Sequence, residues 1–199
     1  MGAQGAGLRL IGIDLSLTST GICVVNDGSI TELDTIKSSG KKGDSITQRG
    51  DRMNWIVEEL VLTHLFWENA DLAVIEAPSY GSSFGSAHDR SGLWWLVVRE
   101  IQGRGIPLAL VSPQGRAKYG TGKGNSKKPE VYAAVKANYA ELVPRPIKNN
   151  DEADAVLLAC IGSRYLGYPV EPVSPGEANL ASLTGVHWPN PEREKAHEA

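Results

Sequence analysis

Two short apolar segments, each ending in an acidic residue, place the strongest limits on how this chain folds. Ile11-Gly12-Ile13-Asp14 ends the first, and Ala73-Val74-Ile75-Glu76 ends the second. Continuous apolar runs of this length are typical of strands that are buried within a sheet. Because α/β sheets bind their ligands at strand ends, we expect both carboxylates at the edge of the core, where a ligand could reach them.

The rest of the pattern predicts two further strands directly after the first. Asn26-Asp27-Gly28 is a strong turn signal, and it predicts a hairpin between strands over 21–25 and about 30–36. Helices and strands then alternate: we expect helices over 46–67 and 91–102, and strands over 72–77 and 107–112. Three further helices follow, a short one after Pro113, one from about Pro129 and one over 151–166. This order predicts an α/β fold with a mixed five-stranded sheet, an antiparallel meander plus parallel strands, flanked by helices.

Composition limits the class of protein. With 199 residues, 41% of them hydrophobic and 22% charged, the chain is an ordinary globular one. No apolar run approaches the roughly 20 residues of a membrane span, and we expect a cytoplasmic protein. The only cysteines, Cys23 and Cys160, are predicted to be buried reduced thiols rather than zinc ligands.

We expect one domain over residues 1–168 and a Pro-rich C-terminal tail over 169–199. The tail carries four large apolar residues that could pack against the domain or against a partner: Leu180, Leu183, Val186 and Trp188.

Two more acids, Asp151 and Asp154, are three residues apart near the predicted start of the last helix, and so share one helix face. Each alone could simply favour the helix start. If they met Asp14 and Glu76, the four carboxylates would repel one another unless cations neutralised them. Oxygen ligands without cysteine or paired histidine favour Mg²⁺ or Mn²⁺ over zinc, and two such ions can catalyse phosphodiester hydrolysis.

A basic segment over residues 115–128 contains no acid, although the chain has a net charge of −3. We expect its cations to contact DNA phosphates in a sequence-independent way, and they are Arg116, Lys118, Lys123, Lys127 and Lys128. The alternative is a solvated loop. The spacing around Gly122-Lys123-Gly124 does not fit a nucleotide-binding P-loop.

These motifs resemble, in the right order over about residues 10–166, those of the RuvC-type Holliday junction resolvases. The resemblance lies in the segment 12–21, in Ile75-Glu76-Ala77-Pro78, in the basic segment 113–131 and in Asp151-Glu152-Ala153-Asp154-Ala155. It implies an RNase H-like fold, two magnesium (or manganese) ions, a homodimer, and paired nicks across a four-way DNA junction. A phage-type member would act in the host cytoplasm. The family's catalytic, metal-binding acids correspond here to Asp14, Glu76, Asp151 and Asp154.

Two features depart from the resemblance or extend it. The segment after Glu76 is rich in Gly and Ser, and Tyr80 and Phe84 are its candidates for the aromatic that contacts DNA at the junction crossover. Glu152 lies between two of the acids but would point elsewhere on the helix, so we treat it only as a candidate for the outer shell of the metal site.

Other functions remain open at this stage. The enzyme could act on a broader set of branched DNA, such as flaps and forks, or be a non-catalytic DNA-binding module on the same fold. Gly12-Ile13-Asp14-Leu15-Ser16 also resembles the first phosphate loop of actin-like and sugar-kinase ATP-binding proteins, but those need a duplicated domain, for which 199 residues are too few.

Overall fold

The computed structural model describes residues 7–63, 70–78 and 87–190. Its sheet contains five strands in the order β3-β2-β1-β4-β5. Their bounds are Arg9–Asp14 (β1), Ser19–Asn26 (β2), Ser29–Lys37 (β3), Leu72–Glu76 (β4) and Leu108–Val111 (β5). β1 runs antiparallel to β2, which runs antiparallel to β3, whereas β1, β4 and β5 are parallel. The predicted mixed sheet is confirmed.

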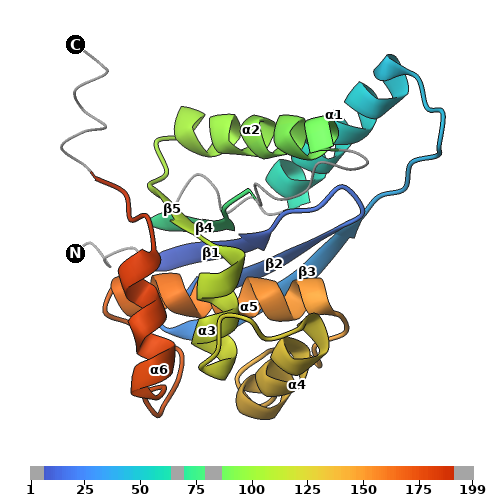
Figure 1. The fold of residues 1–199 in the computed structure, drawn as a ribbon. Helices are drawn as coiled ribbons and strands as arrows, with labels where there is room; N and C mark the ends of the chain where they lie inside the picture. The colour runs from blue at the N-terminus through green and yellow to red at the C-terminus, as the bar shows by residue number, and fades with distance from the viewer. Residues whose placement is uncertain (1–6, 64–69, 79–86, 191–199) are drawn as a thin grey trace, which may run out of the picture.

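Helices cover both faces of this sheet (Figure 1). Helices α1 (Ile46–Thr63) and α2 (Ala87–Gly103) pack on one face, and α5 (Asn150–Tyr165) packs on the other, beside α3 (Pro113–Thr121) and α4 (Lys128–Tyr139). Each face has its own apolar core. Both cysteines are free and buried, as predicted. Among the described helices, none combines the length and the apolar character needed to cross a membrane.

The hairpin between β2 and β3 turns at Asp27 and Gly28, where the sequence predicted it. Both residues have positive φ angles, 48° and 76°. Positive φ at both central positions characterises the type I′ turn, whose twist matches that of the flanking strands. The hairpin therefore sets the antiparallel half of the sheet beside β1.

Helix α5 lies directly on the backbone of β1 because β1 has a glycine at the crossing point. A Cβ atom added to Gly12 would lie 2.5 Å from the amide nitrogen of Ala159 and 2.6 Å from the carbonyl oxygen of Ala155. On β2, a Cβ added to Gly21 would overlap the backbone of Asp151. Only glycine permits so close an approach of two backbones, so these positions set the distance between α5 and the sheet.

The C-terminal segment folds back onto the domain. Val170 is buried in the core on the α5 side, and the four apolar residues noted in the tail pack against that same core: Leu180, Leu183, Val186 and Trp188. The backbones of His187 and Leu110 exchange two hydrogen bonds of 2.9 Å at the edge of β5. Two short helices, Glu177–Leu180 (α6) and Ala181–Gly185 (η2), lie between. We call residues 170–188 the C-terminal strap.

The contact at Gly12 predicts that Gly12→Ala lowers the free energy of unfolding by about 3 kcal/mol, because the added methyl group would overpack β1 against α5. Chemical denaturation measures this. Gly50→Ala is the matched control: Gly50 lies within α1 with open space around the position of a Cβ, so the same change should stabilise the protein by about 0.5–1 kcal/mol. Equal effects at both positions would contradict the packing argument.

Candidate active site

Asp14 and Glu76 end neighbouring parallel strands and face the same side of the sheet. Side chains alternate between the two faces along a strand. Leu10 on β1 and Val74 on β4 belong to the core on the α5 side, so Asp14 and Glu76, at an even spacing from them, also face α5. The register of β1 and β4 brings the two carboxylate-bearing positions side by side at the strand ends.

The first turns of α5 bring the other two acids to the same place. Asn149 caps the helix, and its side chain accepts a hydrogen bond from the backbone N–H of Glu152 (2.8 Å). Asp14 is the register partner of Gly21, over which the backbone of Asp151 lies. Asp154, one turn further on, is buried. The structure thus brings together all four acids that the sequence singled out; their catalytic and metal-binding roles stay predictions.

Burial and negative charge both act on Asp14. The pKa of this carboxyl is raised from 3.8 to about 7, first by burial and then by the neighbouring charge of Glu76. Arg116 acts in the opposite direction, Asp151 raises the pKa further, and Lys128 lowers it. The carboxyls of Glu76 and Asp151 are therefore close enough to act on the charge of Asp14.

Arg116 lies between two of the acids. Its Nε donates to Glu76 Oε2 at 2.5 Å, and one of its two terminal nitrogens, Nη1, pairs with Asp154 Oδ1. The residue is only 7% exposed. We expected Arg116 among the exposed cations that contact DNA, but in the structure its guanidinium faces the acids. Tyr119 and Gly120, three and four residues later, share its helix face, and both are buried in the structure. The only sign of this in the sequence was the large aromatic Tyr119 on that face.

The residues of this cluster fit a divalent cation. All four candidate ligands offer carboxylate oxygens, the donors that Mg²⁺ and Mn²⁺ prefer, and two cations would relieve the repulsion that raises the pKa of Asp14. Within the described ranges, no three acidic, histidine or cysteine side chains are arranged to hold an ion as they stand. Arg116 accounts for this at Glu76 and Asp154, because its guanidinium links those two carboxylates.

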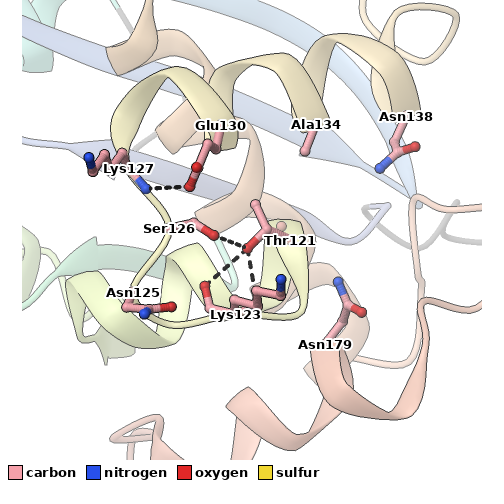
Figure 2. A pocket seen from close by; sticks show the side chains of 10 residues that line it. Thr121, Lys123, Asn125, Ser126, Lys127, Glu130, Ala134, Asn138 and Asn179 are labelled. Atoms are coloured by element: carbon pink, nitrogen blue, oxygen red, sulfur yellow. Dashed lines mark hydrogen bonds between the residues drawn. The ribbon is translucent and has the colours of Figure 1, made fainter.

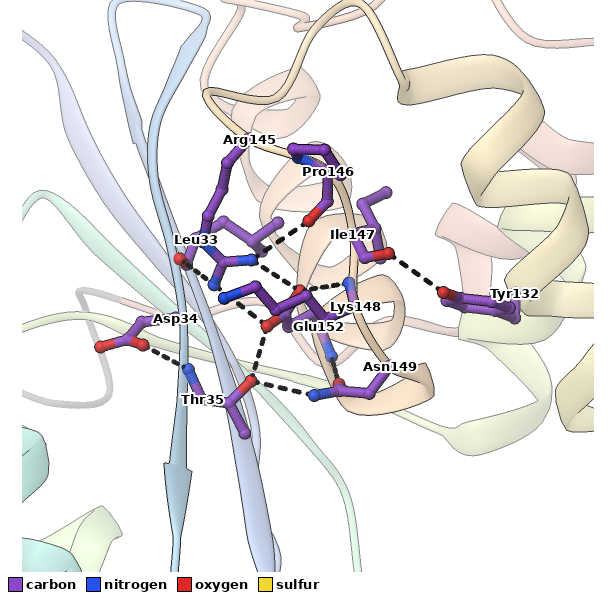
Figure 3. A network of polar contacts seen from close by, with 10 residues as sticks. All are labelled: Leu33, Asp34, Thr35, Tyr132, Arg145, Pro146, Ile147, Lys148, Asn149 and Glu152. Atoms are coloured by element: carbon purple, nitrogen blue, oxygen red, sulfur yellow. Dashed lines mark hydrogen bonds and ion pairs between the residues drawn. The ribbon is translucent and has the colours of Figure 1, made fainter.

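Glu152 points away from the cluster, as the sequence suggested, and forms a separate network (Figure 3). Its carboxylate accepts hydrogen bonds from Arg145 (3.0 Å twice), Thr35 Oγ1 (2.8 Å) and the backbone N–H of Lys148 (2.8 Å). Burial acts to raise the pKa of Glu152, but these hydrogen bonds outweigh it and lower that pKa. Glu152 therefore stays ionised and ties the start of α5 to β3.

The basic segment is part helix and part loop, rather than a loop throughout. α3 extends to Thr121, and Gly122 ends it with a φ of 79° and an N–H bonded to the carbonyl of Lys118. The Thr121 hydroxyl then donates to the carbonyl of Lys123 (3.0 Å) and shares a hydrogen bond with Ser126 (2.9 Å). The loop over residues 122–127 is therefore internally bonded.

This loop borders a polar cavity of about 690 Å³ (Figure 2). Its wall comes from the end of α3, the loop, α4 and the strap: Gly120, Thr121, Lys123, Asn125, Ser126, Lys127, Glu130, Ala134, Asn138 and Asn179. Lys123, Lys127 and Lys128 are exposed, and Lys118 is half-buried. Lys128 also acts on the pKa of Asp14, so the basic segment reaches from the cavity to the acids. Tyr80 and Phe84 lie outside the described residues.

The pKa of Asp14 predicts how the stability of the metal-free protein changes with pH. Between about pH 4 and 7 the unfolded chain has lost this proton while the folded protein keeps it, so folding binds a proton and stability falls as pH rises. Asp14→Asn removes this dependence. The unfolding free energy of Asp14→Asn minus that of the wild-type protein should rise by roughly 2–4 kcal/mol between pH 4 and 7, and should stay constant above pH 7. A difference that stays flat from pH 4 to 8 in urea titrations would refute the assignment.

The ion pairs of Arg116 predict that Arg116→Met destabilises the protein more without Mg²⁺ than with it. Removing the guanidinium leaves the buried carboxylate of Asp154 and the partly exposed carboxylate of Glu76 uncompensated, a loss of about 3 kcal/mol, whereas bound Mg²⁺ would take over the neutralisation. Thermal unfolding in EDTA and in Mg²⁺ measures both. Arg49→Met, which breaks the surface pair with Asp89, should change stability little in either condition. An equal loss for Arg116→Met in both conditions would count against a metal site here.

Comparison with known proteins places the fold. No protein-family profile and no curated protein sequence matches the chain. Among solved structures, Thermus thermophilus RuvC matches with a TM-score of 0.60 at 17% identity, over 83% of this chain and 100% of that one. T. thermophilus RuvC in complex with a Holliday junction substrate matches with 0.56 at 16% identity, over 83% and 99%. The yeast mitochondrial Holliday junction resolvase Ydc2 matches with 0.52 at 14% identity, over 96% and 85%. This chain therefore has the RNase H-like fold of the RuvC-type resolvases.

Proposed function

We propose that this protein is a structure-selective DNA endonuclease that resolves four-way junctions by metal-dependent phosphodiester hydrolysis. The observation that carries the proposal is the cluster of four acids at one end of the sheet, in which burial and neighbouring carboxylates raise the pKa of Asp14 and which adjoins a basic segment. The chain shares its fold with T. thermophilus RuvC, which has been solved with a Holliday junction substrate. Fold alone does not fix activity, so the site carries the argument.

Asp14, Glu76, Asp151 and Asp154 would hold two Mg²⁺ or Mn²⁺ ions. When bound, such ions polarise the attacking water and stabilise the charge on the leaving oxygen. Hydrolysis adds water across the bond between phosphorus and the 3′ oxygen, which leaves a 5′-phosphate and a 3′-hydroxyl.

The chain's own residues prepare the site for this reaction. Asp14 has to give up its proton before it can act as a ligand, and a bound cation would favour this step by stabilising the carboxylate. Arg116 would exchange partners: once other cations neutralise Glu76 and Asp154, its guanidinium becomes free to donate hydrogen bonds to the oxygens of the scissile phosphate. A guanidinium suits this role because its forked donors match the geometry of phosphate.

The exposed lysines would hold the DNA backbone beside the acids. Lys123 and Lys127 line the cavity next to α3, and Lys128 begins α4 directly after them. Together with Lys118 they suit sequence-independent contacts. Tyr80 and Phe84 stay our candidates for stacking at the junction crossover. A homodimer would present two such sites to one junction, so that paired strands are nicked.

The test is a cleavage assay on synthetic DNA with Mg²⁺, in which a four-way junction is compared with flap, fork and linear duplex substrates. We expect the wild-type protein to nick the junction, and Asp14→Asn to lower the rate by about 1,000-fold, because loss of a metal ligand removes several kcal/mol of transition-state stabilisation. Glu58→Gln, an exposed position on α1, is the control and should keep full activity.

The other outcomes separate the alternatives. Similar rates on flaps and forks would indicate a nuclease for branched DNA in general. Junction binding without cleavage in any divalent metal would indicate a non-catalytic DNA-binding module. ATP turnover without nicking would favour the ATP-binding class.

A further inference from the structure

The C-terminal strap bonds directly to the helix that carries Arg116. The side-chain amide of Asn179 donates to the carbonyl of Tyr119 at 2.6 Å, within the last turn of α3. Glu171, at the start of the strap, accepts a hydrogen bond from the hydroxyl of Tyr119 at 2.5 Å. The strap therefore holds α3 through both the backbone and the side chain of one residue.

These contacts are buried, and they belong to a charged network. The carboxylate of Glu171 also accepts from the hydroxyl of Tyr139 on α4 (2.9 Å) and pairs with Arg164 on α5 (2.8 Å). Nε of Arg164 donates to the hydroxyl of Tyr119 at 3.1 Å. The side chain of Glu171 is only 9% exposed. A buried charge with several fixed partners holds one geometry, because loss of any partner leaves polar groups unpaired.

α3 connects the two parts of the proposed DNA-binding surface. Arg116, three residues before Tyr119, faces the acids. Gly122, three residues after it, begins the loop that carries Lys123 and Lys127. Any displacement of Tyr119 would therefore move the guanidinium and the loop together.

The strap also contributes to the cavity beside that loop. Asn179 lines the cavity with Thr121, Lys123 and Ser126 (Figure 2). A Cβ added to Gly122 would lie 3.6 Å from Oδ1 of Asn179, so the amide packs against the residue at which α3 ends. With lysines and small polar groups in its wall, the cavity suits a phosphate of the DNA backbone.

We propose that the C-terminal strap is a positioning element of the DNA-binding surface, in which Asn179 fixes the end of α3 and the loop over residues 122–127 so that they can bind DNA backbone phosphates. The inference rests on the proposed nuclease function. Asn179 is a positioning residue: it acts through Tyr119 and the loop, and the acids that would carry out hydrolysis lie elsewhere.

The test compares Asn179→Ala with Thr184→Ala in the full chain. Thr184 lies on the same strap, is exposed, and bonds only within η2, to the carbonyl of Ala181 at 3.0 Å. We expect Asn179→Ala to weaken binding of a synthetic four-way junction in EDTA by about threefold to tenfold, the equivalent of one hydrogen bond. The single-turnover cleavage rate at saturating protein should stay within about twofold of wild type, because the acids are untouched and the bonds of Tyr119 to Glu171 and Arg164 still hold the turn that carries Arg116.

A second measurement needs no DNA. Hydrogen exchange of the free protein should show faster amide exchange over residues 118–127 in Asn179→Ala, and unchanged exchange in β1 and β4. Thr184→Ala should match wild type in every measurement.

The outcomes separate this inference from the function on which it rests. If the wild-type protein binds and cleaves the junction while Asn179→Ala equals it in affinity and exchange, the positioning role is overturned and the nuclease proposal stands. Faster exchange without weaker binding also overturns the role in DNA binding, and so does a slower saturated rate at unchanged affinity. If the wild-type protein does not bind junction DNA at all, both proposals fail.

Discussion

The contact between α5 and the sheet is made backbone to backbone, and the arrangement of the site depends on it. Gly12 and Gly21 leave room for the helix where any other residue would place a Cβ atom inside it. The helix consequently brings Asp151 and Asp154 to the level of the strand ends, where Asp14 and Glu76 already face the same side. A bulkier β1 would separate the acids by moving the helix outward, even if every acid were retained.

The second constraint is electrostatic: four carboxylates that lie close together have to be compensated within the fold. Burial first, and then the charges of Glu76 and Asp151, raise the pKa of Asp14. Arg116 supplies an internal cation at Glu76 and Asp154. The fold compensates for carboxylates this close together with the guanidinium of Arg116 at Glu76 and Asp154 and with a raised pKa at Asp14.

Much of the sheet and both pairs of acids could be predicted from the sequence, because short-range rules determine them. Apolar runs mark β1 and β4, the turn at Asp27 and Gly28 marks the hairpin, and spacing of three places Asp151 and Asp154 on one face. The direction of Arg116 could not be predicted in this way, since it depends on where α3 packs after β5. The apolar residues of the strap were expected to pack against the domain or a partner, and they pack against the domain. Its contacts with α3 could not be predicted, because its short helices have no periodicity and these contacts involve distant residues such as Tyr119.

Glu152 adds a constraint of a different kind. Its carboxylate accepts hydrogen bonds from Arg145 and from Thr35, both of which lie outside α5. These bonds fix the first turn of the helix, and with it Asp151 and Asp154, against β3. The orientation of α5 at its first turn is therefore set by Glu152, a residue outside the acid cluster, and does not depend on the charge state of the four acids.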